Sequence, residues 1–273
     1  MSAPHATVAE HELQQLRAEL ARSQQQVADM AAAQEEFLRA VSHDLRAPLR
    51  HITSYGKLVR EVLGDLPAEV QAAEPLREAH DFLGTMEQSA RRMALMLDGL
   101  LALSRAGRAP LHPQPVDLAA AVDQARAALP AAPASQAAAA QWTLPGGLPT
   151  VQADPALLHE LLVQVLGNAL KFSQRPAAPA PHITVRAVPA ERGAGWAAWE
   201  VQDQGAGFDP ARAAGLFGVF HRLHRETEFN GVGAGLAVCR AIAQRHGAHI
   251  SATAAPGQGC TVRVEWPAAG GGG

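Results

Sequence analysis

Residues 41–49 read VSHDLRAPL, and they lie inside a long segment whose apolar residues recur at helical spacing. His43 and Asp44 interrupt the apolar pattern, and Pro48 follows five residues after the histidine. An unprotonated imidazole nitrogen is nucleophilic near neutral pH, and Asp44 is placed to accept a hydrogen bond that fixes the tautomer. Because Pro48 cannot donate to the carbonyl of Asp44, we predict a helix that bends just past His43. Taken alone, the pattern is equally typical of an ordinary exposed His-Asp pair.

The segment before His43 has a heptad pattern, and the segment after it a second apolar stripe. We expect residues 1–10 to be unstructured, residues 1–34 to act as a coiled-coil lead-in, and residues 35–107 to form a helical hairpin. The first helix should end near residues 64–67, and the second should run from near Pro75 to residues 104–107. A hairpin this thin cannot bury its stripe alone, so we predict a homodimer in which two hairpins make a four-helix bundle. The seam positions are Leu13, Leu16, Leu20, Ser23, Val27, Met30, Gln34 and Phe37.

The second half of the chain mixes strand and helix patterns. Three prolines make residues 108–115 a linker, residues 116–267 form one domain, and residues 268–273 form a flexible tail. Because strands and helices do not alternate strictly, we predict an α/β sandwich with helices on one face of the sheet. The expected helices are 116–129, 155–173 (capped by Asp154) and 234–246, and the expected strands are 141–144, 182–188, 196–201, 250–254 and 260–266.

Composition limits the classes of function. The formal net charge is −3 with a pI near 6.5, which gives no support to nucleic-acid binding. The two cysteines, Cys239 and Cys260, have no metal-ligand spacing and are expected to be reduced. No apolar run reaches the roughly 18 residues of a membrane helix, and no signal peptide is visible. We therefore expect a soluble cytoplasmic protein or a soluble fragment of a larger one.

Residues 203–209, DQGAGFD, directly follow a predicted strand. A buried carboxylate at a strand end, Asp203, can accept the exocyclic amine of a purine. Gly205 and Gly207 would let the backbone pass close to a flat ring. The alternative is an ordinary turn that ends a strand.

A second glycine cluster, GVGAGL at residues 231–236, opens a predicted helix. Backbone N–H groups at a helix start favour phosphate. The cluster is neither a Walker loop nor a dinucleotide fingerprint, because it lacks Gly-Lys-Ser/Thr and follows no strand.

Gln164, Asn168 and Lys171 are spaced four and three residues apart, so they share one helix face. The amide oxygen of Asn168 suits Mg²⁺, which prefers oxygen ligands, and Lys171 offers a point charge to phosphate. The alternative is a solvated polar face.

Taken in order, these segments resemble the boxes of sensor histidine kinases, especially the phytochrome-like branch. Residues 41–49 resemble the phosphoacceptor box, 164–173 the N box, 203–208 the first glycine box, 216–224 the F box, 231–236 the second glycine box and 257–260 the last glycine turn. The ATP-binding fold of that family is shared with gyrase-type ATPases, the heat-shock ninety chaperones and mismatch-repair ATPases. The resemblance covers residues 34–266.

The resemblance implies an ATP-dependent protein-histidine kinase that uses Mg²⁺. It implies that His43 receives the phosphoryl group beside Asp44, that Asn168 holds Mg²⁺, and that an Asp of a response-regulator receiver domain then accepts the phosphoryl group. An upstream sensor domain or sensor protein is a further possible partner, and the signal is not readable. The implied ATP-binding residues are Asn168, Lys171, Phe172, Asp203, Gly205, Gly207, Phe208, Gly231, Gly233, Gly235 and Leu236.

Two departures from the family pattern matter. Gln164 stands where these kinases often have Asn, and where the related ATPases have a Glu that activates water. Because an amide is a poor base, we expect this chain to hydrolyse ATP only weakly. Ala47 stands where kinases with strong phosphatase activity often have Thr or Asn, so we expect little phosphatase activity. Two alternatives stay open: an ATPase that drives a conformational clamp, and a catalytically silent dimer that only binds receiver domains.

Overall fold

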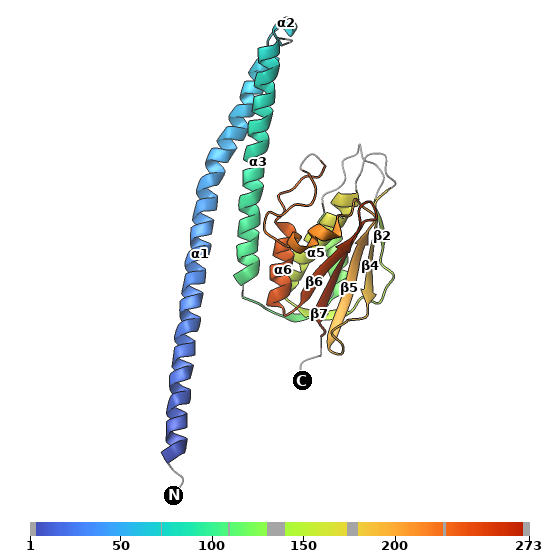
Figure 1. The fold of residues 1–273 in the computed structure, drawn as a ribbon. Coiled ribbons are helices and arrows are strands. Elements are labelled where there is room, and N and C mark those ends of the chain that lie inside the picture. The colour runs from blue at the N-terminus through green and yellow to red at the C-terminus, as the bar shows by residue number, and fades with distance from the viewer. Residues whose placement is uncertain are drawn as a thin grey trace.

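The computed structural model describes residues 4–71, 73–108, 110–129, 140–173, 180–225 and 228–269. Figure 1 shows two parts: a long helical hairpin, and beside its second helix an α/β unit with a twisted sheet. The fold is therefore the predicted one, a helical hairpin followed by an α/β domain. Residues 130–139 and the end of the predicted tail, residues 270–273, lie outside the described residues.

The hairpin consists of α1 (Pro4–Gly64), a short α2 (Ala68–Gln71) and α3 (Glu74–Arg108). Pro48 lies inside α1 without ending it, and Figure 1 shows the axis of α1 changing direction partway along, so that its second half runs beside α3. The prediction that residues 1–10 are unstructured was wrong, because α1 already begins at Pro4.

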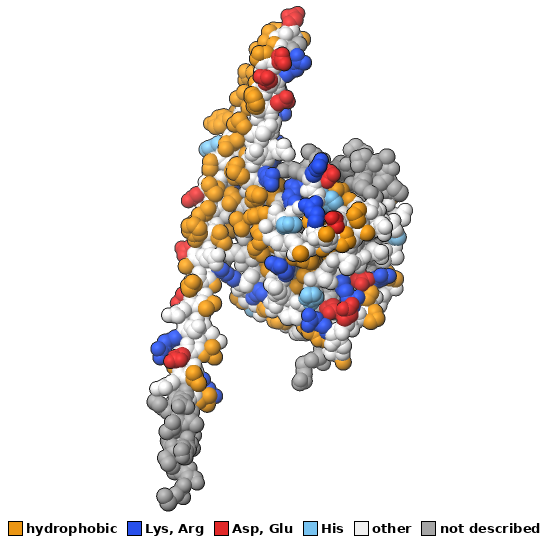
Figure 2. All heavy atoms as spheres, in the orientation of Figure 1, with side chains coloured by type: hydrophobic (Ala, Val, Ile, Leu, Met, Phe, Trp, Pro, Cys, Tyr) orange, Lys and Arg blue, Asp and Glu red, His pale blue; other side chains and the backbone are white. Residues whose placement is uncertain are grey.

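A single hairpin buries few of its apolar side chains. Leu49, Ala90 and Leu97 form a small buried cluster between the two helices. In Figure 2 apolar side chains cover much of the visible hairpin surface. The large exposed ones are Leu13, Leu16, Leu20, Val27, Met30, Phe37, Leu45, Ile52, Tyr55, Leu58, Val59, Val62, Phe82, Met86, Met93 and Leu95. Such a continuous exposed apolar face is typical of an interaction surface.

The α/β unit is built on a five-stranded sheet of order β2-β4-β5-β7-β6. Only the β2–β4 pair is parallel among these neighbours. The helices α5 and α6 lie on one face of the sheet, as predicted (Figure 1). The strands are β2 (Gln141–Thr143), β4 (His182–Val188), β5 (Trp196–Asp203), β6 (His249–Ala254) and β7 (Cys260–Pro267), and the helices are α4 (Leu118–Ala127), α5 (Pro155–Ser173), the 3₁₀ helix η2 (Pro210–Gly215) and α6 (Gly235–Arg245).

The core lies between this sheet and its helices. Leu158, Leu161 and Leu162 of α5 are fully buried against it, because apolar residues recur on one face of that helix. The predicted cap is present, since the Asp154 carboxylate accepts hydrogen bonds from the backbone N–H groups of Ala156 (3.0 Å) and Leu157 (3.2 Å). This cap fixes where α5 begins, and with it the angular position of the polar residues further along.

Two short strands were missed by the sequence analysis. β1 (Gln114–Asp117) pairs antiparallel with β3 (Thr150–Ala153), so the predicted linker ends in a strand. The next helix therefore begins at Leu118 rather than at Val116, with the Asp117 side chain capping it. Four-residue strands show too few alternations to be read from sequence. Ala268, assigned to the tail, forms a bridge to Val151.

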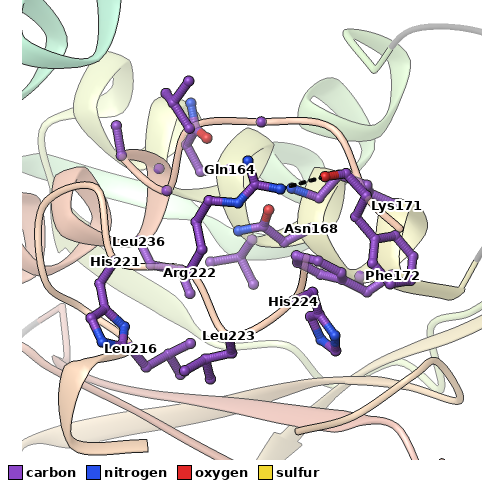
Figure 3. A pocket seen from close by; sticks show the side chains of 18 of the residues that line it. Gln164, Asn168, Lys171, Phe172, Leu216, His221, Arg222, Leu223, His224 and Leu236 are labelled. Atoms are coloured by element: carbon purple, nitrogen blue, oxygen red, sulfur yellow. Dashed lines mark hydrogen bonds between the residues drawn. The ribbon is translucent and has the colours of Figure 1, made fainter. Parts of the chain in front are cut away.

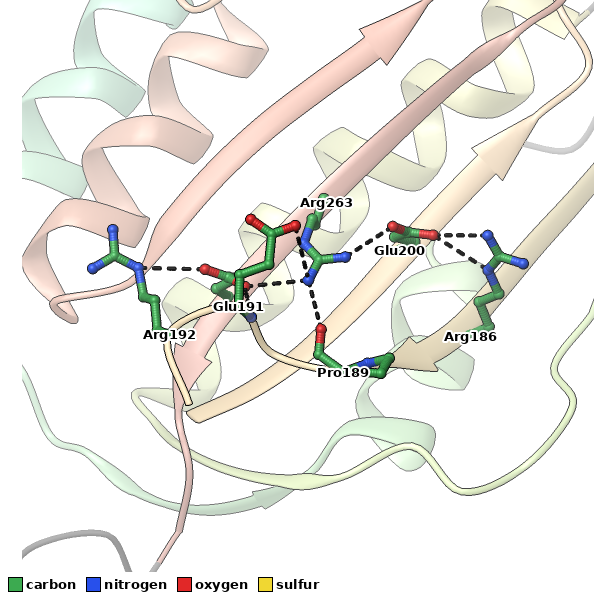
Figure 4. Close-up of polar contacts among 7 residues, drawn as sticks. Arg186, Pro189, Glu191, Arg192, Glu200 and Arg263 are labelled. Atoms are coloured by element: carbon green, nitrogen blue, oxygen red, sulfur yellow. Dashed lines mark hydrogen bonds and ion pairs between the residues drawn. The ribbon is translucent and has the colours of Figure 1, made fainter. Parts of the chain in front are cut away.

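The outer face of the sheet carries a network of ion pairs, shown in Figure 4. Arg263 contacts Glu200 (3.1 Å), Glu265 (3.3 Å) and Glu191 (3.5 Å). Burial is the largest single influence on the pKa of Glu265, and it acts to raise it. Hydrogen bonds from the backbone N–H of Glu191 and from the Arg263 guanidinium act in the opposite direction, and together with the nearby positive charges they hold this pKa below its ordinary value. The network ties β5 and β7 to the turn that follows β4, on the face away from the helices.

Candidate functional site

A cavity of about 430 Å³ opens between the start of α6, α5 and the described residues of the loop before α6, 216–225 and 228–233, called here the 216–233 loop. Its size lies within the usual range for small-molecule sites. Figure 3 shows side chains from α5 and from the 216–233 loop directed into this space. Four residues of α3 complete its wall: Leu95, Asp98, Gly99 and Ala102.

Asp203 lies at the end of β5 and lines the cavity. Burial raises the pKa of its carboxyl group, and hydrogen bonds from the backbone N–H groups of Gly205 and Cys260 act in the opposite direction. Both N–H groups reach the same oxygen, Oδ1, at 2.8 and 3.2 Å. Among the described residues, both of these hydrogen bonds go to Oδ1, so the second oxygen, Oδ2, can accept a hydrogen bond from an N–H group of a ligand.

Gly205, in the first glycine box, is required for close packing. A Cβ on Gly205 would lie 2.5 Å from the carbonyl oxygen of Phe172, which also accepts a hydrogen bond from the Ala206 N–H at 3.0 Å. Gly205 does not line the cavity, and its predicted contact with the ligand stays a prediction. It lets the β5 turn pack directly on the end of α5, which places Asp203 beside Phe172.

Two cationic side chains converge in the cavity. Lys171 comes from α5, and a Cβ built on Gly231 would lie 3.4 Å from its Nζ. Burial and the positive charge of Arg222 together lower the pKa of Lys171 to about 8. Arg222 enters from the 216–233 loop and donates to the carbonyl oxygen of Phe229 at 2.7 Å. Sequence reasoning placed Arg222 in a box without giving it a role, because its direction depends on the path of the loop.

The α5 face predicted to be polar does point into the cavity. Asn168 and Gln164 both line it, together with the start of α6 (Figure 3). A Cβ on Gly235 would lie within 2.4 Å of the Gln164 amide oxygen, so glycine is needed for α6 to begin this close to α5. Among the described residues no group of three or more His, Cys, Asp or Glu side chains could hold a metal ion. Asn168 offers an amide oxygen at the cavity wall, and oxygen is the ligand type that Mg²⁺ prefers.

An aromatic cluster closes the other end of the cavity. Phe172, His224 and Phe229 have ring centroids 5.0–5.2 Å apart, and Lys171 Nζ lies 4.2 Å from the centre of the Phe172 ring. Of the two histidines of the loop, His221 is exposed, whereas His224 is half-buried. Burial lowers the pKa of His224, despite the opposing charge of Glu228.

His43 and Asp44 lie apart from the cavity lining, on α1, with 86% and 81% of their side chains exposed. The Nδ1 atom of His43 lies 3.1 Å from Oδ1 of Asp44. In the neutral imidazole, Nδ1–H then donates to the carboxylate and leaves the lone pair of Nε2 free toward solvent. Adjacent helical residues do not usually face each other, so this contact depends on both side chains bending toward one another.

The cavity therefore gathers most of the residues predicted to bind ATP. Those that line it are Asn168, Lys171, Phe172, Asp203, Gly207, Phe208, Gly231, Gly233, Gly235 and Leu236. The α3 residues of the wall were not predicted, because no sequence pattern indicates that the hairpin packs here. Gly99 makes this packing close: a Cβ on it would lie 2.5 Å from the Cβ of Ala234.

Two family models match this chain. The model of the His Kinase A phospho-acceptor domain matches residues 33–109, and that of the histidine kinase-, DNA gyrase B- and HSP90-like ATPase matches residues 153–270. The chain belongs to the histidine kinase family. In this histidine kinase the first match covers the hairpin with His43, and the second covers the sheet, α5 and α6.

Similar proteins support the same assignment. The histidine kinase is 29% identical over 260 residues to cyanobacterial phytochrome A of Nostoc sp., covering 95% of this chain and 31% of that protein. It is 33% identical over 240 residues to the sensor histidine kinase TrcS of Mycobacterium tuberculosis, covering 85% of this chain and 43% of that protein. Full-length ShkA in complex with AMPPNP is similar in structure, with a TM-score of 0.56 and 25% identity over 85% of this chain and 45% of that one. The chain thus spans less than half the length of these relatives.

Within the described part of the chain, no helix is both long enough and apolar enough to cross a membrane.

Proposed function

We propose that this histidine kinase transfers the γ-phosphoryl group of ATP to His43 and then to an Asp of a response-regulator receiver domain. One observation carries the proposal: a cavity with two convergent cations and a buried carboxylate lies on the same chain as an exposed histidine whose Nδ1 is held by Asp44. The cavity supplies a nucleotide site, and the histidine supplies a nucleophile.

The residues of the cavity fit a purine nucleoside triphosphate. Oδ2 of Asp203 would accept the exocyclic amine of adenine beside the Phe172 ring. Lys171, Arg222 and the N–H groups at the start of α6 would neutralise the phosphates. Mg²⁺, carried by the phosphates, would complete its shell with Asn168 and water, and would draw charge from the transferring group.

At His43 the lone pair of Nε2 attacks the γ-phosphorus, and the bond from phosphorus to the bridging oxygen of ADP breaks. The imidazole becomes positively charged as the new N–P bond forms. Asp44 holds the Nδ1 proton and stabilises that charge. Because phosphoryl transfer depends on positioning and charge neutralisation, few other protein groups need to react. An Asp carboxylate of the receiver then takes the phosphoryl group and regenerates neutral His43.

The proposed assembly is a homodimer through the hairpin. The exposed apolar side chains of α1 and α3 support it, because two hairpins packed together would bury both faces as a four-helix bundle. An upstream sensor domain or sensor protein would act through α1, and the proposed location is the cytoplasm.

Gln164 argues against the alternative of an ATP-driven clamp. Its amide lies in the cavity where a hydrolytic ATPase needs a base, and an amide cannot accept a proton from water. Ala47, one turn after His43, supports a kinase with low phosphatase activity, since a methyl group cannot orient water.

Incubation with γ-labelled ATP and Mg²⁺, followed by addition of a receiver domain, tests the proposal. The expected label on the kinase is lost in acid and kept in alkali, as a phosphoramidate requires, and it moves to the receiver. Release of labelled phosphate without any protein label would instead indicate an ATPase. Nucleotide binding without either product would indicate a silent scaffold.

A further inference from the structure

Arg46 connects the phosphoacceptor helix to the wall of the cavity. Its guanidinium Nη2 lies 2.7 Å from Oδ1 of Asp98, which is 52 residues away on α3. Asp98 lines the cavity beside Gly99, the residue that packs against Ala234 at the start of α6. The guanidinium of Arg46 is therefore held beside the place where the phosphates of a bound nucleotide are expected.

Arg46 also shares a helix face with the nucleophile. It follows His43 by three residues on α1, and residues at that spacing are neighbours on a helix surface. A group transferred to His43 Nε2 would thus come within reach of the Arg46 side chain.

Asp98 is poorly suited to remain the partner of Arg46 when the γ-phosphoryl group approaches His43 during transfer. Asp98 is a carboxylate at the edge of a site built for phosphate, so incoming negative charge repels it and attracts the guanidinium. Both side chains of the pair are about half exposed, at 44% and 57%, and such pairs are weak. A guanidinium also matches the oxygens of a phosphoryl group with two parallel N–H donors, which makes phosphate a stronger partner.

Resting on the function proposed above, we propose that Arg46 is a catalytic residue that exchanges Asp98 for the γ-phosphoryl group during transfer to His43. Arg46 stays protonated throughout and forms no covalent bond. Its N–H groups stabilise the charge on the equatorial oxygens while the bond to ADP breaks and the bond to Nε2 forms. Asp98 restrains Arg46 before transfer and competes with the phosphoryl group for it.

The competition gives Arg46 and Asp98 opposite effects, which a structural ion pair would not. If the pair only ties α1 to α3, removing either partner has the same consequence. If Arg46 serves the reaction, Arg46→Ala slows autophosphorylation, whereas Asp98→Asn, which removes the competing carboxylate, raises its rate. Arg60 offers a matched control, because it also pairs α1 with α3, through Glu87 at 3.3 Å, far along the hairpin from His43.

The test is single-turnover phosphorylation of the full chain with saturating γ-labelled ATP and Mg²⁺, with ATP affinity measured separately by calorimetry. We expect Arg46→Ala to slow the phosphorylation step roughly tenfold to a hundredfold. Since Arg46 does not line the cavity, ATP affinity should stay nearly unchanged. Arg46→Lys can keep the ion pair with Asp98, but an ammonium group cannot place two parallel N–H donors on a phosphoryl group. Its phosphorylation step should therefore also be slow. Arg60→Ala should match the unmodified chain.

Three results would overturn the role of Arg46: a normal rate for Arg46→Ala, a normal rate for Arg46→Lys, or equal losses for Arg46→Ala and Asp98→Asn. Circular dichroism and light scattering of each variant verify that fold and assembly are retained. If the unmodified chain itself acquires no label on His43, the proposed function fails and the role of Arg46 fails with it. Labelling of the unmodified chain together with any of the three results rejects the role of Arg46 alone.

Discussion

The pKa of Lys171 makes nucleotide affinity depend on pH in a predictable direction. Burial and the neighbouring charge of Arg222 lower this pKa to about 8 in the free protein. Phosphate binds the ammonium form, so bound nucleotide raises the pKa and binding takes up protons. Affinity should be level below pH 8 and should fall as pH rises through that value.

The magnitude follows from the fraction of Lys171 that is protonated before binding. With a pKa of about 8, the ammonium form is about 90% of the total at pH 7 and about 10% at pH 9. If only that form binds, the dissociation constant for ATP with Mg²⁺ rises about tenfold across this range. Other groups of the cavity interfere little, because the pKa of His224 lies below its ordinary value and that of Cys260 is raised to about 12, mainly by burial.

Calorimetric titrations of ATP at pH 7, 8 and 9, in buffers of different ionisation enthalpy, measure both the affinity and the proton uptake. Lys171→Met should bind weakly with no dependence on pH, and Lys171→Arg should bind tightly with none. Arg222→Gln should move the midpoint to higher pH, because it removes the neighbouring positive charge. Two results would refute the assignment of Lys171 as the titrating group: a tenfold loss of ATP affinity between pH 7 and 9 that persists in Lys171→Met, or constant affinity across this range in the unmodified chain.

Asp203→Asn should weaken ATP and ADP binding alike by about 1–3 kcal/mol, since the adenine amine loses its acceptor; normal binding by calorimetry would mean that the base lies elsewhere. The full chain should be a dimer by light scattering at micromolar concentration, and substituting Phe82 of the exposed hairpin face by Glu should shift it toward monomer, whereas an unmodified monomer would contradict the four-helix bundle. His246 accepts the Asp154 N–H at Nε2 and contacts the carbonyl oxygen of Ile242 through Nδ1. Burial lowers its pKa, so the unfolded state binds more protons and the free energy of unfolding should fall as pH drops below the ordinary His value of about 6.5. Denaturant titrations should show that the free energy of unfolding decreases less between pH 7 and 5 in His246→Gln than in the unmodified chain. An equal decrease in the two proteins would exclude His246 as the source of this pH dependence.

The order of elements and most of the cavity could be predicted because those segments carry strong local patterns. Periodicity defined α5, and its spacing correctly placed Asn168 and Lys171 on one face. Asp203 was predictable from a strand that ends at a glycine-rich turn. In each case the position of a side chain follows from the geometry of a single element.

What sequence reasoning missed depends on how elements pack together. Arg222 enters the cavity because the 216–233 loop folds over it, and the carbonyl of Phe229 fixes the guanidinium. Asp98 and Gly99 line the cavity because α3 packs on α6, which no pattern within α3 indicates. The close packing of Gly205 against the carbonyl of Phe172 was also not predicted, because it depends on how the end of β5 meets the end of α5. The short strands β1 and β3 exist through their pairing with each other.

The central claim is that ATP bound in the cavity phosphorylates His43. The most direct measurement is peptide mapping, under alkaline conditions, of the full chain after incubation with ATP and Mg²⁺. The account predicts one phosphorylated site, at Nε2 of His43, with no modification in His43→Gln although that variant still binds ATP. Phosphate on another residue, or protein phosphorylation that persists in His43→Gln, would contradict it.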